Sequence, residues 1–121
     1  GANNHMGSRF TEDRKRMRLV LARLQARSMF YVDSFTSAAS VGEITAQQMG
    51  LPTARRTVFL DNQQQSGAIC RQLGVLAAKA TAEGEAIAIG HPNLAMVEAL
   101  TTCAGERLRD VQLVGVERLV H

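Results

Sequence analysis

The chain has 121 residues, enough for one small domain or for part of a larger one. Hydrophobic residues make up 45% of it and aromatic residues only 4%, so we expect a core built from aliphatic side chains. The 14 Lys and Arg residues exceed the 11 Asp and Glu residues by three. This excess is too small, and the aromatic stacking partners too few, to indicate nucleic-acid binding. No segment approaches the roughly 20 apolar residues of a membrane-spanning helix, so the sequence predicts no membrane span.

Helical and extended segments alternate along the chain. Apolar residues at helical spacing predict a helix over residues 11–27 with Thr11 as its N-cap, and its basic residues are interpreted as its solvent-facing side. The apolar run 29–32 predicts a buried strand that ends at Asp33. The pattern continues as helix 41–49 after Ser40, strand 57–60, helix 64–82, strand 86–89, helix 94–103 and strand 111–115. About four parallel strands alternating with helices predict an α/β fold.

The alternation is incomplete at its start. Residues 1–8 are polar, and no strand is predicted there. Four strands with their helices cannot close a barrel, so we expect residues 1–121 to be a single partial domain. Its open sheet edge would be covered by an N-terminal half outside this chain or by a partner chain.

The two cysteines, Cys70 and Cys103, stand far apart in helix-like segments. Neither belongs to a Cys-x-x-Cys or His-rich pattern, which argues against a metal or redox motif. The sequence favours two buried thiols, and it leaves a disulfide open if the compartment is oxidising.

Three titratable residues follow predicted strands: Asp33, Asp61 and His91. Because parallel strands end on the same edge, we expect these residues at one rim, where they could supply the acid and base of a hydrolase. Asp33 is interpreted equally well as a turn or cap residue, and for Asp61 the favoured interpretation is the cap of the helix that follows. His91 lies between Gly90 and Pro92, which favours a functional role.

Four ordered motifs resemble the divergent polysaccharide deacetylase family. They are Asn-Asn-His-Met-Gly-Ser at residues 3–8, Val-Asp-Ser at 32–34 with Thr36, Arg56 with Val-Phe-Leu-Asp-Asn at 58–62, and Ala-Ile-Gly-His-Pro at 88–92. The resemblance implies the C-terminal half of a distorted (β/α) barrel. It also implies a metal-dependent carbohydrate esterase-like protein that removes acetyl groups from cell-envelope polysaccharide, by cleaving a carbon–nitrogen or ester bond.

The resemblance further implies roles for individual residues. His91 would be the general acid, Asp33 or Asp61 would orient its ring, and His5 would be a ligand of a divalent metal, zinc in the first place. The catalytic base and another metal ligand would lie upstream, so this fragment alone is expected to be inactive. A peptidoglycan-like glycan partner and a periplasmic or envelope location are also implied.

The sequence also allows two alternatives to the deacetylase interpretation. A non-catalytic glycan-binding or envelope-scaffold module could use the same fold, with the polar rim holding sugar or a protein partner. A sugar-phosphate barrel enzyme is disfavoured because the glycines stand singly and form no phosphate loop.

Overall fold

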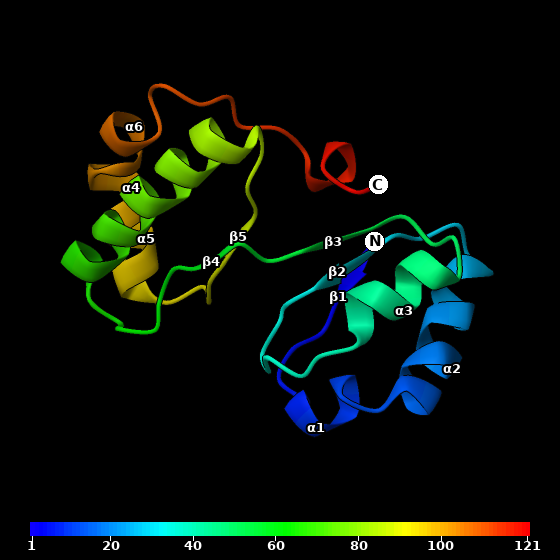
Figure 1. Ribbon diagram of the computed structural model, residues 1–121. Helices are drawn as coiled ribbons and strands as arrows, with labels where there is room; N and C mark the ends of the chain where they lie inside the picture. The colour runs from blue at the N-terminus through cyan, green and yellow to red at the C-terminus, as the bar shows by residue number, and fades with distance from the viewer. The chain divides into compact units, whose positions relative to one another are not determined.

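The computed structural model describes residues 1–121, and the chain divides into two compact units (Figure 1). The first unit comprises residues 1–56 and 116–121, and the second comprises residues 57–115. In both units short parallel strands alternate with helices. The predicted α/β class is therefore confirmed, and the alternation fits part of a (β/α) barrel. None of the helices is both long and apolar enough to cross a membrane.

The first unit contains a three-stranded parallel sheet in the order β1 (Ala2–Asn3), β2 (Tyr31–Asp33) and β3 (Thr53–Arg55). The expectation that the chain opens without a strand is wrong, because Ala2 pairs with Tyr31 and its N–H donates to the Phe30 carbonyl at 3.0 Å. A strand of two residues is too short for side-chain alternation to reveal it. At the other edge, Thr53 and His121 exchange two backbone hydrogen bonds, of 3.0 and 3.1 Å.

Helices α1 (Ser8–Thr11), α2 (Arg14–Gln25) and α3 (Gly42–Gln48) complete the first unit, together with the short 3-10 turn η1 (Val116–Arg118). The helix expected over residues 11–27 is confirmed as α2 with shorter bounds, and Thr11 is the last residue of α1 and not the N-cap of α2. Asp13 caps α2 instead, because its carboxylate accepts from the Arg16 N–H at 3.1 Å. The buried cluster of this unit contains Met17, Leu21, Tyr31, Ala46 and Leu51.

The second unit contains the parallel pair β4 (Val58–Phe59) and β5 (Ala88–Ile89), with helices α4 (Ser66–Glu83), α5 (Leu94–Thr102) and α6 (Ala104–Arg107). Its core is formed by residues of β4, α4 and α5 and by Leu60, which directly follows β4: Val58, Leu60, Ile69, Leu73, Met96 and Ala99. The strand predicted at 111–115 is wrong. This segment pairs with no strand, and Leu113 is 74% exposed, since apolar alternation gives a strand only where a neighbouring backbone pairs with it.

A disulfide joins Cys70 of α4 to Cys103, which directly follows α5. The two Cα atoms lie 6.0 Å apart. The interpretation of two buried thiols is therefore wrong. Both cysteines pack against the same apolar cluster, so the contact between α4 and α5 brings them within bonding distance despite a separation of 33 residues in the sequence.

Candidate active site

A buried carboxylate contacts a histidine ring at the ends of β4 and β5. The register of this pair sets Phe59 against Ile89, so the residues beyond the two strands also become neighbours. His91 Nδ1 lies 3.0 Å from Asp61 Oδ2 and 3.3 Å from Oδ1, and the His91 backbone N–H donates to Oδ2 at 3.1 Å. The structure therefore brings together two of the three predicted strand-end residues.

The two partners differ in their exposure to solvent. The Asp61 side chain is 0% exposed, whereas the His91 side chain is 45% exposed. The His91 ring also lies against Phe59, with 5.7 Å between the ring centroids. A carboxylate beside Nδ1 favours the tautomer that carries its proton on Nδ1. This arrangement suits a histidine that exchanges protons through Nε2.

Asn93 is a member of this cluster that was not predicted from the sequence. Its Nδ2 donates to Asp61 Oδ2 at 3.1 Å, and its Oδ1 accepts from the Met96 N–H at 2.9 Å as the N-cap of α5. An asparagine directly before a helical segment is a recognisable capping signal, although its second contact could not be foreseen. Asn93 therefore fixes both α5 and the Asp61 carboxylate.

The favoured interpretation of Asp61 as the cap of the next helix is wrong. Helix α4 begins after Gln65 without a side-chain cap, and the hydrogen bonds of the Asp61 carboxylate go to the loop after β5. At Gly90, beside the pair, a Cβ atom would lie 2.3 Å from the flexible end of the Met96 side chain and at an ordinary contact distance of 3.5 Å from Asp61 Oδ1. The Asp61 carboxylate is thus held by the loop after β5 and not by α4.

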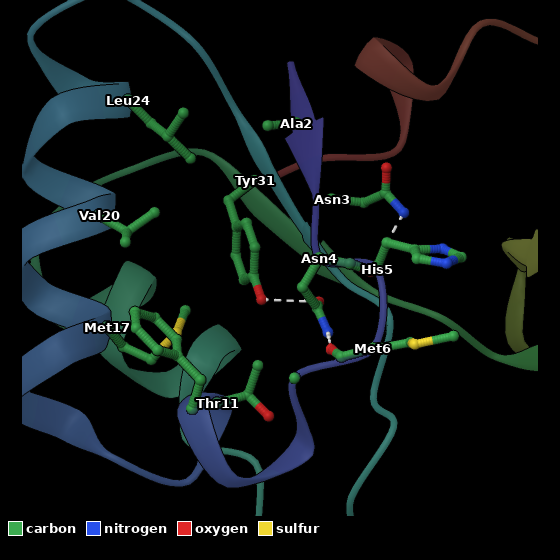
Figure 2. Close-up of a pocket in the computed structure, with 12 residues that line it drawn as sticks. Ala2, Asn3, Asn4, His5, Met6, Thr11, Met17, Val20, Leu24 and Tyr31 are labelled. Atoms are coloured by element: carbon green, nitrogen blue, oxygen red, sulfur yellow. Dashed lines mark hydrogen bonds between the residues drawn. The ribbon is translucent and has the colours of Figure 1, made fainter.

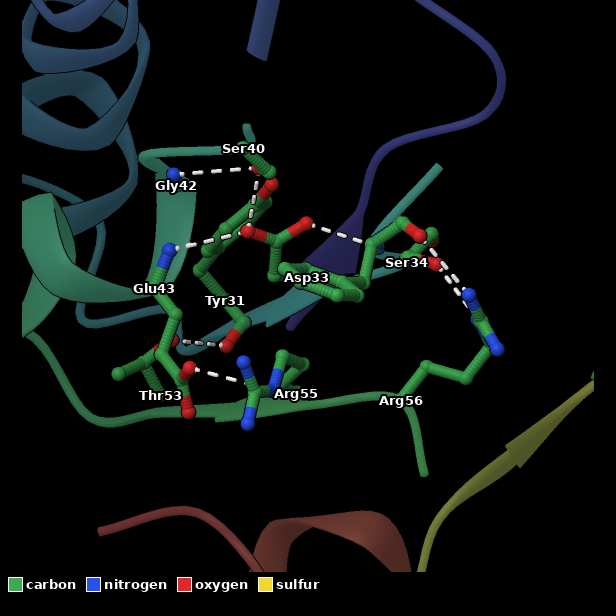
Figure 3. Close-up of polar contacts among 10 residues, drawn as sticks. Tyr31, Asp33, Ser34, Ser40, Gly42, Glu43, Thr53, Arg55 and Arg56 are labelled. Atoms are coloured by element: carbon green, nitrogen blue, oxygen red, sulfur yellow. Dashed lines mark hydrogen bonds and ion pairs between the residues drawn. The ribbon is translucent and has the colours of Figure 1, made fainter. Parts of the chain in front are cut away.

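Asp33 has a different environment in the first unit (Figure 3). It is 1% exposed, and its Oδ1 accepts from the Phe35 N–H at 2.8 Å. Its Oδ2 accepts from Ser40 Oγ at 2.7 Å and from the Glu43 N–H at 3.1 Å. These contacts close the turn after β2 and cap the first turn of α3, which is the geometry of the turn-and-cap interpretation. The convergence of Asp33 with Asp61 and His91 on one rim remains a prediction.

Arg56 holds the backbone that follows Asp33. Its Nε donates to the Ser34 carbonyl at 2.7 Å and its Nη2 to the Phe35 carbonyl at 2.8 Å (Figure 3). Phe35 has a positive φ of 48°, a strained conformation for a bulky residue. Burial lowers the pKa of Arg56, and the negative charge of Asp33 partly offsets that effect. The arginine quoted in the motif thus supports the loop after β2.

The motif at residues 3–8 places Asn4 against the end of β2. Asn4 Oδ1 accepts from the Tyr31 hydroxyl at 2.9 Å and from the Ser34 N–H at 2.8 Å. The pKa of Tyr31 is raised above its usual value, first by burial and then by the negative charge of Asp33. Asn4 therefore anchors the segment that carries His5.

His5 is exposed at the margin of a cavity of about 410 Å³. Figure 2 shows its ring on the other side of the N-terminal segment from Tyr31, Met17 and Leu24, which belong to the apolar part of the lining. No three His, Cys, Asp or Glu side chains of the chain form a group that could hold a metal ion. The predicted metal ligand His5 is thus not accompanied by a ligand set within these residues.

Comparisons with known proteins give the chain a family context. The model of the family described as divergent polysaccharide deacetylase matches residues 1–120. An uncharacterized protein of Haemophilus influenzae is 35% identical over 119 residues, and the uncharacterized protein YibQ of Escherichia coli is 33% identical over 121 residues. These matches cover 98% and 100% of this chain but 42% and 38% of the two relatives. The chain therefore spans about two fifths of their length.

A solved structure gives a close match to the fold. The crystal structure of the uncharacterized protein ATU2773 from Agrobacterium tumefaciens C58 matches with a TM-score of 0.92 and 26% sequence identity. The match covers 99% of this chain and 49% of that protein.

Proposed function

The chain belongs to the divergent polysaccharide deacetylase family, and from that premise we propose that it contributes the general acid of a carbohydrate deacetylase. The reaction would hydrolyse an N- or O-acetyl group on a cell-envelope glycan. A water oxygen forms a new bond to the acetyl carbonyl carbon. The bond between that carbon and the nitrogen or oxygen atom of the sugar breaks. The proposal assigns protonation of the departing sugar atom to His91, and it assigns the base that activates water to the part of the longer protein outside this chain.

The contact between Asp61 and His91 is the observation that carries this proposal. The imidazolium form of His91 would donate its Nε2 proton to the departing amine or alcohol, while the Asp61 carboxylate stabilises its charge and holds its ring. Asn93 and the His91 backbone N–H keep the carboxylate in place. An exposed ring on a buried, hydrogen-bonded carboxylate is well suited to this role.

The same proposal includes a divalent metal, with zinc as the favoured ion, bound by the longer protein. The residues of this chain do not form a metal site by themselves. His5 is proposed as one ligand of a set completed by residues outside the chain, and Asn4 would fix its segment through Tyr31 and Ser34.

We also propose a periplasmic or envelope location. The disulfide between Cys70 and Cys103 supports this, because disulfides persist in oxidising compartments and are rare in the cytosol. An envelope location would place the protein beside a peptidoglycan-like glycan.

The test is acetate release from acetylated envelope glycans by a full-length protein that contains this chain, with zinc, cobalt or manganese supplied. We expect His91→Ala to lower kcat by about 10²–10⁴-fold, and Asp61→Asn to lower it substantially. Asp110→Asn is the matched control, since the Asp110 side chain is 81% exposed and contacts only Arg109. Full activity of His91→Ala, or no acetate release by the unaltered protein with any of the metals, would contradict the proposal.

A non-catalytic glycan-binding module is the second candidate. It is favoured by the hydrogen bonds that engage the Asp33 carboxylate in its own loop and in α3. Glycan binding that survives His5→Ala, in a full-length protein without bound metal by elemental analysis, would support this candidate.

A further inference from the structure

The first 28 residues carry a strong excess of positive charge. They contain seven Lys and Arg residues and two Asp and Glu residues, whereas residues 29–121 contain seven and nine. The local net charge is therefore +5 in the first segment and −2 in the rest. Five of the seven cationic side chains lie in the 12-residue helix α2, which contains no acidic residue.

Helix stability does not explain this distribution. The first turn of α2 holds Arg14, Lys15 and Arg16, where the positive end of the helix dipole disfavours cations. Arg14 and Arg18 are also like charges four residues apart, a spacing that destabilises a helix. Where local charge opposes local structure, a functional reason for the charge is the expected explanation.

The outward side of α2 combines these charges with an exposed leucine. Met17 and Leu21 face the core, at 2% and 0% exposure. Lys15, Leu19 and Arg23 follow one another at intervals of four residues on the opposite side, with Arg18 on their flank. We call these four residues the α2 basic face. Leu19 is 72% exposed on this side of the helix, whereas Met17 and Leu21 on the other side are buried in the core.

The cations of the α2 basic face have no acidic partner. Arg14 donates to Gln48 Oε1 at 2.7 Å, and Arg16 pairs with Asp13 at 3.2 Å, so these two neighbours are engaged within the protein. The side chains of Lys15, Arg18 and Arg23 are exposed and make no ion pair or hydrogen bond; Arg23 accepts from Arg27 only through its backbone carbonyl. Their charge is therefore available to an external anion.

We propose that the α2 basic face docks the protein on an anionic phospholipid surface. Cations attract the negative headgroups, and an apolar side chain among them can enter the headgroup boundary. The exposed Leu19 favours lipid over an anionic glycan. Proteins bind sugars through aromatic and hydrogen-bonding side chains, and the α2 basic face contains no aromatic residue. The attachment is peripheral and is independent of the proposed deacetylase chemistry.

The test is co-sedimentation of a protein containing residues 1–121 with vesicles of phosphatidylcholine alone or mixed with phosphatidylglycerol. We expect binding only to the mixed vesicles, weakening as salt rises. Lys15→Glu with Arg18→Glu should lower the affinity at least about tenfold, since each cation near such a surface contributes about fivefold. The same pair should leave the melting temperature unchanged or raise it, because it removes cations from the start of the helix.

Two further variants separate this docking from a general charge effect. Arg71→Glu with Arg107→Glu makes the same change in net charge on exposed residues of α4 and α6, and should retain affinity within about twofold. Leu19→Ser should weaken binding without any change in charge. Equal loss in the control pair, equal binding to phosphatidylcholine, or binding to a phosphorylated glycan with none to vesicles would overturn the proposal.

Discussion

Asp33 and Asp61 begin from the same position in the sequence pattern, directly after a short buried strand, and they end in different environments. Asp33 accepts from two backbone N–H groups and a serine hydroxyl of its own loop and α3. Asp61 accepts from a half-exposed histidine ring. The comparison teaches that an aspartate at a strand end gains a chemical role from the partner that faces it, and not from its position alone.

The two units also differ in their covalent cross-links. Removing the cross-link of the second unit is expected to have the largest effect on the free energy of unfolding. Only the second unit contains a disulfide, between Cys70 and Cys103. Replacing both cysteines with serine should lower the free energy of unfolding of that unit by about 3–4 kcal/mol, the value for a loop of this length. Hydrogen exchange should show the loss in residues 57–115, while amides of the first-unit sheet stay protected. Equal loss in both units would contradict the division.

Removal of the Asp33 carboxylate is expected to act on stability. Asp33→Ala leaves buried donors from Phe35, Ser40 and Glu43 without their acceptor, and should lower the free energy of unfolding of the first unit by about 3 kcal/mol. Denaturant unfolding measures it. Asp61→Asn is the comparison, because it keeps the shape of the side chain and should affect acetate release more than stability. A stable Asp33→Ala protein would show that the network is not structural.

A smaller effect is expected at Gly42, the first residue of α3. A Cβ atom there would lie 2.6 Å from Asp33 Oδ2 and 2.9 Å from the Tyr31 hydroxyl. Gly42→Ala should therefore cost about 1–3 kcal/mol of unfolding free energy. Gly67→Ala is the control, because a Cβ atom at Gly67 would meet only the end of the Arg71 side chain. Gly50→Ala is less suitable, because Gly50 has a positive φ of 68° that disfavours alanine. A loss in Gly67→Ala as large as in Gly42→Ala would contradict this account.

The smallest effect concerns pH and Tyr31. Burial and the charge of Asp33 raise the pKa of Tyr31, so its hydroxyl stays protonated in the folded chain when an unfolded chain would ionise it. Tyr31 therefore contributes stability below the unfolded pKa of about 10, and this contribution is lost as pH rises beyond it. Tyr31→Phe should remove that alkaline loss, at a cost of about 1 kcal/mol for the hydrogen bond to Asn4.

Tyr31 can be observed directly, because the chain has one tyrosine and no tryptophan. Tyrosinate absorbance in the folded protein should appear only above the pH at which a denatured sample ionises. Ionisation of the folded and denatured samples at the same pH would contradict the buried position of Tyr31 against Asn4.

The sequence predicted those features that depend on local pattern. The α/β alternation followed from apolar spacing, and the neighbourhood of Asp61 and His91 followed from two consecutive parallel strands. The strand at Ala2 could not be predicted, since two residues carry no periodicity. The strand expected at 111–115 failed because its pattern contains no information about a pairing partner.

Long-range contacts set the limit of sequence reasoning in the candidate site. The disulfide depends on the packing of α4 against α5, which the spacing of Cys70 and Cys103 does not encode. The contact between Asn93 and Asp61 likewise joins residues that are 32 positions apart in the sequence. Asp33 and Asp61 both follow a predicted strand in the sequence, and only their three-dimensional partners separate them.

The most direct test of the central claim is nitrogen NMR of the His91 ring, recorded with the imidazole in its neutral form. The account predicts that the proton resides on Nδ1, held by the Asp61 carboxylate, and that Asp61→Asn shifts the population toward the Nε2–H tautomer. A neutral His91 with its proton on Nε2 in the unaltered protein would contradict the claim that Asp61 prepares this histidine for proton transfer.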